Sequence, residues 1–323
     1  MTYQMKYLTI FTPTYNRAYL LPRLYNSLLA QKNKNFEWII IDDESSDDTQ
    51  NVVNAFLLND NEFPIIFESQ KHGGKHRAIN RALEIAQGDF FFIVDSDDYI
   101  VENAVELLYK WSKEIQSEMV CGISGLKMLV TRNEKICKSM QWKDKKYIVA
   151  GNLEREKYGL LGDMAEVYKT DIMRANRFPE FENEYFVTEN VCWNAIAAKG
   201  YKLLWFNEVI YMCDYLKDGL TQNGANAIQG HINNYRGFIY YILENKTIKN
   251  SYNFTFDFLE YEKTARYLKK TYKERVNELG MHLPQYLLYR FVQVPIFFIF
   301  IKSKRLFRRL VYYVIQLIKS QMK

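Results

Sequence analysis

The sequence predicts an α/β fold built on a mostly parallel sheet with helices on both faces. Across about the first hundred residues, short β-branched and aromatic runs alternate with segments in which apolar residues recur at helical spacing. Turn residues separate the two kinds of segment. Strand and helix repeated in this order favour parallel pairing, because parallel strands need a long crossover connection that is usually helical.

The expected elements can be placed by residue. The expected strands are Lys6–Thr12, Phe36–Asp42, Ile65–Glu68 and Asp89–Val94. The expected helices carry apolar stripes within residues 20–29, 52–57 and 78–86. A fourth helix is expected from Thr188–Asn190 through Ala198, because Gly200 follows it.

Polar clusters follow each of the four expected strands. The clusters are Thr12–Arg17, Asp42–Asp47, Lys71–Lys75 and Asp95–Asp98. In parallel α/β sheets, ligands bind outside the carboxyl ends of the strands. We therefore expect these four clusters to form one site.

Asp95, Asp97 and Asp98 place three carboxylates in four residues, directly after the apolar run Phe90–Val94. Such carboxylates repel one another unless a cation or strong hydrogen-bond donors compensate them. Mg²⁺ and Mn²⁺ prefer oxygen ligands, and Mg²⁺ often binds through one or two carboxylates and substrate phosphates. The alternative is an acidic turn that caps a helix starting near Glu102.

The other clusters suit a nucleotide diphosphate. Asp42 or Asp43 can accept a hydrogen bond from a base. Gly73-Gly74 permits close backbone approach, and Lys71, Lys75 and Arg77 place positive charge beside it. An ordinary tight turn is the alternative for the two glycines. The sequence contains neither GxGxxG nor GxxxxGK[ST], which argues against a dinucleotide fold of the usual kind and against a P-loop.

Together these motifs resemble the family 2 glycosyltransferases, which have the Rossmann-like GT-A fold. The resemblance is strongest over about the first hundred residues. It rests there on Thr12–Arg17, Ile41–Thr49, Gly73-Gly74 with Ala78–Asn80, and Val94–Asp98. It continues less tightly through Gly162-Asp163, Phe178–Glu180, Thr188–Asn190 and Tyr215–Thr221.

The resemblance implies inverting transfer of a sugar from a nucleotide-diphosphate donor, most often a UDP-sugar. The acceptor would be a hydroxyl of a glycan or lipid-linked glycan in cell-surface polysaccharide synthesis. Carried over by motif, Thr12, Pro13 and Tyr15 line the nucleoside pocket, and Asp42 or Asp43 binds the base. The remaining donor-binding residues are Arg17, Gly73, Gly74, Lys75, Arg77, Asp95 on the ribose side, and Ser96. Asp97 would be the protein ligand of Mn²⁺ or Mg²⁺, and Asp98 an outer group.

The expected catalytic base is the point at which this chain departs from the family. Family members commonly place Glu-Asp at the start of a helix, with the Asp as base, whereas this chain has Glu189-Asn190. An amide cannot accept the proton, so Glu189 or another carboxylate such as Asp163 would have to serve. Thr188-Glu189 is alternatively a simple helix cap. A catalytically silent nucleotide-sugar-binding or scaffold protein therefore stays open as an alternative function.

The composition and length of the chain indicate its cellular location and its domain organisation. The 323 residues include four cysteines without CxxC spacing, which argues against a zinc site or a disulfide framework and favours a cytoplasmic location. We expect no signal peptide. We expect residues 1–115 to bind the donor, residues 116–227 to hold the acceptor and the base, and residues 228–323 to be helical. The sequence leaves the oligomeric state open.

The last part of the chain is basic. Residues 281–323 contain eight Lys or Arg and no Asp or Glu, although the net charge is only +5. Residues 292–301 are apolar but too short to span a bilayer. Residues 302–319 mix apolar and basic residues, which predicts a helix at the inner membrane surface or one packed on the protein's own core. Nothing in the sequence supports nucleic-acid binding.

Overall fold

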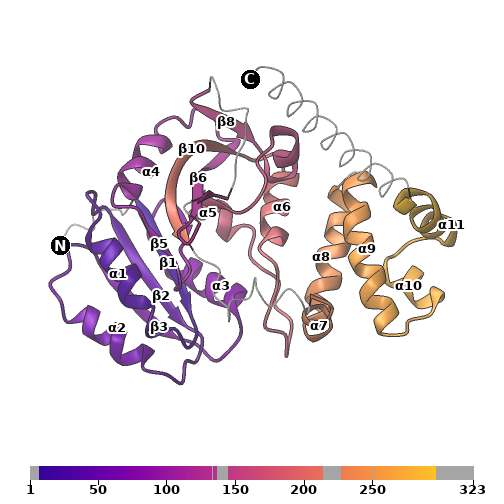
Figure 1. The fold of residues 1–323 in the computed structure, drawn as a ribbon, viewed down its shortest axis with the longest axis horizontal. Coiled ribbons are helices and arrows are strands. Elements are labelled where there is room, and N and C mark those ends of the chain that lie inside the picture. Colours follow the sequence, from indigo (N-terminus) through magenta and orange to yellow (C-terminus); the bar gives the residue numbers. More distant parts are fainter. Residues whose placement is uncertain (1–6, 133, 137–144, 214–226, 250, 296–323) are drawn as a thin grey trace, which may run out of the picture. The chain divides into compact units, whose positions relative to one another are not determined.

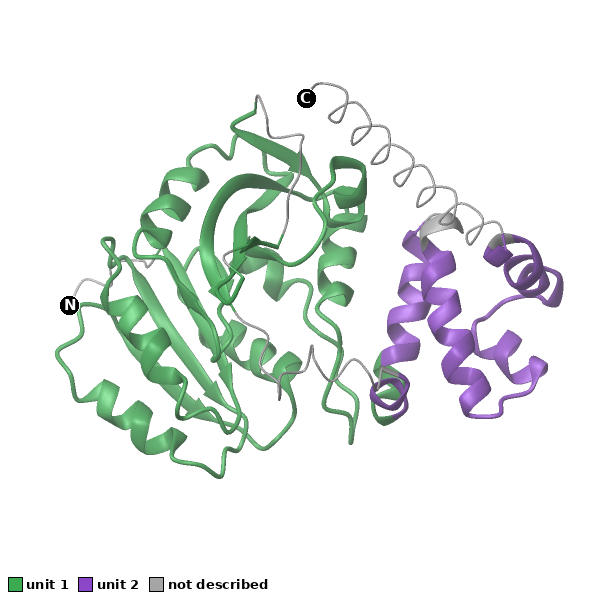
Figure 2. Ribbon diagram, viewed as in Figure 1, with its two compact units in different colours: residues 1–227, 233–237 green, residues 228–232, 238–323 purple. Residues whose placement is uncertain are grey.

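The computed structural model describes residues 7–132, 134–136, 145–213, 227–249 and 251–295. The chain divides into two compact units (Figure 2). The first unit is Met1–Ala227 with Asn233–Gly237, and the second is Ile228–Ile232 with Phe238–Lys323. The functional division of the first unit near residue 115 stays a prediction.

A single mixed sheet forms the centre of the first unit (Figure 1). Its main strand order is β3-β2-β1-β4-β9-β6-β10-β5, with β7 paired to β6 and β8 paired to β10. The strands are β1 Leu8–Thr14, β2 Phe36–Asp42, β3 Ile65–Ser69, β4 Phe90–Ile93, β5 Tyr99–Ile100, β6 Val120–Leu129, β7 Glu134–Lys135, β8 Tyr147–Ala150, β9 Met164–Lys169 and β10 Lys202–Cys213.

Helices connect these strands and cover the sheet. They are α1 Leu21–Leu29, α2 Thr49–Leu57, α3 Lys75–Ile85, α4 Ala104–Ser112, the 3₁₀ helix η2 Asn152–Tyr158, α5 Thr170–Arg174 and α6 Asn190–Ala198. The four predicted strands and the four helices predicted between residues 20 and 198 are present, with ends displaced by a few residues. Gly200, just past α6, has a φ of +89°, which explains why a glycine follows this helix.

The two halves of the sheet differ in strand direction. Strands β1 to β4 run parallel, as the sequence predicts. Strand β9 is antiparallel to both of its neighbours, with Phe92 opposite Val167 and Ser124 opposite Glu166. The start of β9 and the end of β6 therefore lie at the edge where β1 and β4 end. The sequence did not predict this reversal.

The core has two layers, one on each face of the sheet. On one face, α1, α2 and α4 pack against alternate strand residues such as Ile10, Trp38 and Phe92, all fully buried. Figure 1 shows α1 and α2 together on this side of the parallel strands. The other face carries α3, α5 and α6, where Trp193 of α6 stacks on Tyr168 of β9 with ring centroids 4.5 Å apart.

The second unit is helical. Its elements begin with α7 Ala227–Asn233 and α8 Tyr235–Ile248, which share residues with the first unit, and continue with α9 Ser251–Tyr267, α10 Tyr272–Glu278, α11 Leu283–Leu288 and the π-helical turn η4 Tyr289–Gln293. Glu262 of α9 is buried and pairs with Arg275 at 3.3 Å and Arg290 at 3.4 Å. A buried carboxylate is tolerated because these guanidinium groups compensate its charge.

Two predicted features lie outside the described residues. They are the segment Tyr215–Thr221 and the basic amphipathic stretch of residues 302–319. Among the residues that the structure describes, none of the helices combines the length and apolar character needed to cross a bilayer.

We expect Phe92→Ala to lower the free energy of unfolding by about 3–5 kcal/mol, because it leaves a cavity at a fully buried position of β4. Urea denaturation followed by circular dichroism measures the change. The matched control is Phe186→Ala, since that side chain is 47% exposed. Equal losses in the two variants would contradict this description of the core.

Candidate functional site

The turn Asp95–Asp98 lies at the carboxyl end of β4, and its three carboxylates have different surroundings. Lys75 Nζ lies 2.5 Å from Asp95 Oδ1. The Tyr211 hydroxyl donates to Asp98 Oδ2 at 2.8 Å and accepts the Asp95 N–H at 3.0 Å. Asp95 and Asp98 are therefore held within the protein, each by a specific donor.

Asp97 stands apart from the other two carboxylates. Within the described ranges, no side chain pairs with its carboxylate through an ion pair or hydrogen bond. Burial, helped by the charge of Asp95, raises the pKa of Asp97. Burial, together with the charges of Asp95 and Asp97, raises the pKa of Asp98 to about 7. This turn therefore favours additional positive charge at Asp97.

An oxygen-binding divalent cation fits Asp97 on these grounds. The described residues contain no group of three His, Cys, Asp or Glu side chains that could hold a metal ion by themselves. The protein would therefore supply few ligands, as is usual for Mg²⁺ when phosphates and water complete the coordination. The acidic turn is compatible with that arrangement.

Lys75, the first residue of α3, bridges two carboxylates. Its Nζ lies 2.5 Å from Asp95 Oδ1 and 2.7 Å from Glu189 Oε1. Burial lowers the pKa of Lys75, but the attraction of the two carboxylates outweighs burial and raises the pKa overall. Burial alone would raise the pKa of Asp95. The positive charges of Lys75 and Lys127 outweigh burial and lower this pKa, so Asp95 stays ionised.

Glu189 immediately precedes α6, and its side chain makes no capping hydrogen bond to that helix. The carboxylate binds Lys75 instead. The capping interpretation of Glu189 is therefore not supported. The neighbouring Asn190, at the position where the resemblance leads us to expect Asp, is exposed.

A hollow lies behind Lys75 on the α6 side of the sheet. It is lined by Lys75, Ile93, Asp95, Lys127, Met164, Ala165, Glu166, Glu189 and Trp193. Lys127 lies over the Tyr211 ring, 4.3 Å from its centroid. Burial lowers the pKa of Lys127, but Asp95, Asp98 and Glu166 outweigh burial and raise it. The hollow thus combines positively and negatively charged side chains in a largely buried space.

The Gly73-Gly74 turn is bound to Asp43. The Gly73 and Gly74 N–H groups donate to the Asp43 carboxylate at 2.9 Å and 2.8 Å. His72 Nδ1 lies 2.9 Å from the same carboxylate. Asp42 is also buried and accepts from the Ser45 N–H at 3.2 Å. The carboxylates predicted to bind the base thus already have partners within the protein.

An aromatic stack stands beside this turn. His72 lies between Tyr15 and Tyr185, with ring centroids 4.6 Å and 4.8 Å apart. Both tyrosines are 47% exposed, so their outer faces remain accessible to a flat ligand. Base stacking on Tyr15 stays a prediction that this exposure permits.

Arg77 contacts a loop rather than the acidic turn. Its guanidinium donates to the carbonyl oxygens of Gly73 at 2.8 Å, Glu184 at 2.7 Å and Phe181 at 2.5 Å. These bonds join the glycine turn to the loop that leads into α6. In this structure Arg77 positions neighbouring backbone, and a direct contact with a donor stays a prediction.

Other predicted residues lie apart from the hollow. Thr12 is fully buried and accepts a hydrogen bond from Trp38 Nε1 at 2.9 Å. Asp163 is exposed and is not among the residues that line the hollow. Arg17, close to Asp97, contributes positive charge there. Pro13 and Ser96 lie at the ends of β1 and β4, and their predicted contacts with a donor stay untested.

Sequence reasoning missed Lys127 and Glu166. Each is a charged residue within a run that is otherwise mostly apolar, Gly125–Leu129 and Met164–Tyr168. A charged side chain inside a buried strand was the available signal, because such groups are rarely buried without a partner.

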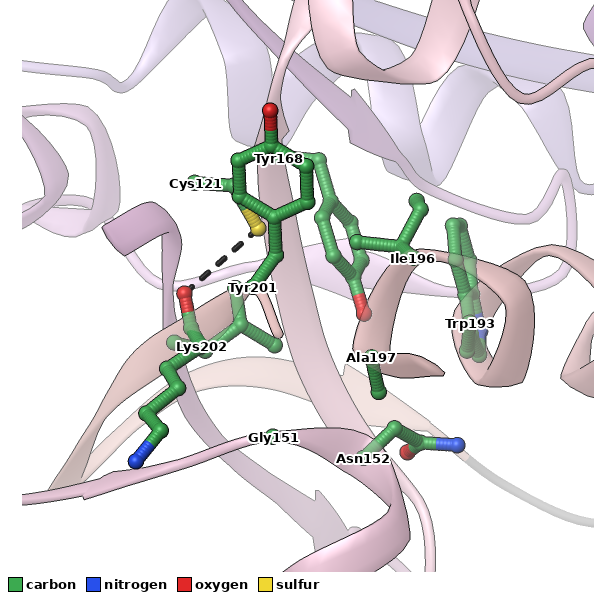
Figure 3. Close-up of a pocket in the computed structure, with 10 residues that line it drawn as sticks. Cys121, Gly151, Asn152, Tyr168, Trp193, Ile196, Ala197, Tyr201 and Lys202 are labelled. Carbon is green, nitrogen blue, oxygen red and sulfur yellow. Dashed lines mark hydrogen bonds between the residues drawn. The ribbon is translucent and has the colours of Figure 1, made fainter. Parts of the chain in front are cut away.

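A second, smaller space lies on the other side of Trp193 (Figure 3). Ile196 and Ala197 of α6 line it together with Tyr168, and the Cys121 thiol donates to the Lys202 carbonyl at 3.4 Å. The space is too small to hold a water molecule. Trp193 thus lines the charged hollow and also packs tightly against the residues behind it.

Residues 9–172 match the family described as "Glycosyl transferase family 2". Because this match covers half of the chain, the protein belongs to that family. The chain is similar to a crystal structure of Staphylococcus aureus TarS in complex with UDP-GlcNAc, with a TM-score of 0.60 and 19% identity over 88% of this chain and 81% of that one. This likeness shows that the fold is GT-A.

Curated relatives are glycosyltransferases by name. Glycosyltransferase GlyG of Streptococcus pneumoniae is 33% identical over 115 residues, which cover 36% of this chain and 38% of GlyG. A Campylobacter jejuni GalNAc(5)-diNAcBac-PP-undecaprenol beta-1,3-glucosyltransferase is 24% identical over 82% of this chain and 81% of its own. A Bacillus spizizenii poly(ribitol-phosphate) beta-glucosyltransferase is 32% identical over 117 residues, which cover 18% of its length. The chain therefore spans well under two thirds of the length of GlyG and of this enzyme.

We expect Gly74→Ala to destabilise the protein by at least about 2 kcal/mol and to weaken nucleotide binding. Gly74 has a φ of +87°, and a Cβ there would lie 1.8 Å from the Tyr185 carbonyl oxygen. Thermal unfolding and calorimetric titration with UDP measure both effects.

Gly73→Ala is the matched control for this substitution. A Cβ at Gly73 would meet the flexible Arg77 side chain at 2.7 Å, so the expected loss is smaller. A Gly74→Ala variant as stable as Gly73→Ala would contradict the described turn.

Proposed function

We propose that this protein transfers a sugar from a nucleotide-diphosphate donor, preferably a UDP-sugar, to an acceptor hydroxyl with inversion. The observation that carries this proposal is the Lys75 bridge between Asp95 and Glu189. It joins the acidic turn, suited to a diphosphate, to the charged hollow, which we propose as the place where the acceptor hydroxyl approaches. Family membership supports the same reaction class.

The donor is proposed to lie along the ends of β1 to β4. Tyr15 offers an exposed ring for the base, and the Gly73-Gly74 turn offers close backbone approach. Asp43 contributes by ordering that turn, as its bonds to both glycine amides support. Asp95 is proposed for the ribose side of the site.

Asp97 is proposed to hold Mn²⁺ or Mg²⁺. A Pyrobaculum calidifontis mannosyltransferase solved with GDP-Man and Mn²⁺ has a similar fold, with a TM-score of 0.53 and 16% identity over 94% of this chain and 88% of that one. When bound, such an ion neutralises charge that develops on the departing diphosphate. Lys75 supplies further positive charge from the protein beside the acidic turn.

In the proposed reaction, the acceptor oxygen forms a bond to the anomeric carbon of the donor sugar. The bond from that carbon to the diphosphate breaks, and its electron pair leaves with the nucleoside diphosphate. The acceptor proton must pass to a base. Among the described residues, Glu189 and Glu166 are the glutamates that line the hollow, while Asp163 is exposed and is not among its lining residues.

The acceptor is proposed to be a glycan or lipid-linked glycan used in cell-surface polysaccharide synthesis. The names of the Campylobacter and Bacillus relatives refer to an undecaprenol-linked glycan and a poly(ribitol-phosphate). The basic residues after Met281 suit attachment to the inner face of an anionic membrane. The protein would then meet its acceptor at that surface.

We expect UDP to bind the wild-type protein more tightly with Mn²⁺ than without it, and Asp97→Asn to remove this difference. The metal-dependent gain should fall by at least about tenfold, because the carboxylate proposed as ligand is gone. Calorimetric titration of UDP with and without Mn²⁺ measures it. Asp60→Asn, an exposed acid in a loop, should behave as wild type. Failure of every nucleoside diphosphate to bind would refute the proposal.

A catalytically silent nucleotide-sugar-binding protein is the second candidate, and Asn190 is the observation that favours it. It would bind a UDP-sugar without consuming it. Release of UDP from UDP-glucose, UDP-galactose or UDP-GlcNAc in the presence of Mn²⁺ distinguishes the two candidates, because only the enzyme releases it.

A further inference from the structure

Glu166 is a largely buried carboxylate in the middle of β9, where it pairs with Arg155. Residues 165 and 167 of β9 point into the core with α1 and α4, so Glu166 points to the opposite face, toward α6. Its side chain is 13% exposed and lines the hollow that also contains Lys75, Asp95 and Glu189. It can therefore meet a group that enters this hollow.

The other candidate bases are less suitable. Glu189 is bound to Lys75 at 2.7 Å, an ion pair that opposes proton uptake. Asn190 carries no basic group, and Asp163 is exposed and is not among the residues that line the hollow. Glu166 is free of such a short lysine contact, since its ion-pair partner Arg155 lies at 3.4 Å.

The charges around Glu166 come from several elements. Arg155 of η2 and Lys127 of β6 lower its pKa, while burial and the charge of Glu189 raise it. Lys75 and Asp95 line the opposite side of the hollow and largely compensate each other. Tyr168 follows on the same face of β9 and is uncharged, because burial raises its pKa well above the ordinary value. Burial dominates, and the pKa of Glu166 is raised to about 7.

We propose that Glu166 is the general base of this enzyme and accepts the proton of the acceptor hydroxyl. This inference rests on the proposed transferase function. As the acceptor oxygen bonds to the anomeric carbon, its O–H bond breaks and the proton passes to a Glu166 carboxylate oxygen. The donor carbon–oxygen bond breaks in the same step, and its electrons leave on the diphosphate. The proton is later lost to solvent.

Arg155 positions this base, whereas Glu189 serves the donor side. Arg155 also donates to the Leu160 carbonyl at 3.0 Å and lies over the Trp205 ring, 5.0 Å from its centroid, so its guanidinium is fixed in place. It thereby holds the Glu166 carboxylate from the side away from the hollow. Glu189 keeps Lys75 beside Asp95, which assigns it to the donor side of the reaction.

The test uses the full chain, Mn²⁺ and a UDP-sugar from the panel above, with water as the acceptor. We expect the wild-type rate of UDP release to fall as the pH is lowered through about 7, because the base becomes protonated. Glu166→Gln should lower kcat by at least about 100-fold and remove this pH dependence. Glu166→Asp should keep the pH dependence and recover part of the rate.

Two further variants separate this role from a structural one. Glu156→Gln, an exposed acid beside Arg155 in η2, should leave the rate unchanged. Glu189→Gln should raise the KM for the donor while keeping the pH dependence near 7. UDP binding by Glu166→Gln should match wild type, which shows that the variant is folded and that only the chemical step is lost.

Three results would overturn the inference. Unchanged kcat in Glu166→Gln would show that the proton goes elsewhere while leaving the transferase function intact. Loss of the pH dependence in Glu189→Gln instead would assign the base to Glu189. A wild-type protein that binds UDP with Mn²⁺ but releases none from any donor would refute the transferase function and the base together.

Discussion

The ammonium group of Lys75 is the interaction on which the site depends. It lies between Asp95 at the end of β4 and Glu189 at the start of α6, and it is itself the first residue of α3. The start of α3 and the end of β4 are thus linked to α6, which is distant in sequence, by one partly buried positive charge. The carboxylates in turn keep Lys75 protonated, since their attraction outweighs the cost of burial. Removing any member would leave an uncompensated charge among partly buried groups.

The reversed direction of β9 gives the site its second half. A parallel strand would place its first residues at the far edge of the sheet, whereas β9 begins at the edge where β1 and β4 end. Together with the end of β6, it brings Glu166 and Lys127 to the acidic turn. Tyr211 of β10 connects these two parts through hydrogen bonds to the turn and the contact with Lys127. In the function that we propose, the donor side comes from the parallel strands and the acceptor side from the mixed ones.

Much of the first hundred residues could be predicted because each signal there is local. Alternating strands and helices have characteristic periods. The cluster Thr12–Arg17 begins in the last residues of β1, and the cluster Asp95–Asp98 comes shortly after β4. Glu166 could not be found in this way, since its importance depends on pairing across the sheet with Ser124 and on packing beneath α6. Arg77 illustrates the same limit: its charge suggested a donor contact, but its guanidinium binds backbone carbonyls of the loop before α6.

The sequence by itself determined the family and the acidic turn, because short motifs identify them. It also determined the α/β class, because the spacing of apolar residues distinguishes strands from helices. It also showed that the catalytic base would be hard to assign. Asn190 is an amide at the position where the resemblance to the family implies an Asp base. Only the tertiary structure decided that Glu189 binds Lys75, that the Asp163 side chain is exposed, and that Glu166 lines the hollow. The physical reason is that the protonation and reach of a carboxylate depend on burial and on neighbouring charges, which residues far apart in the chain supply together.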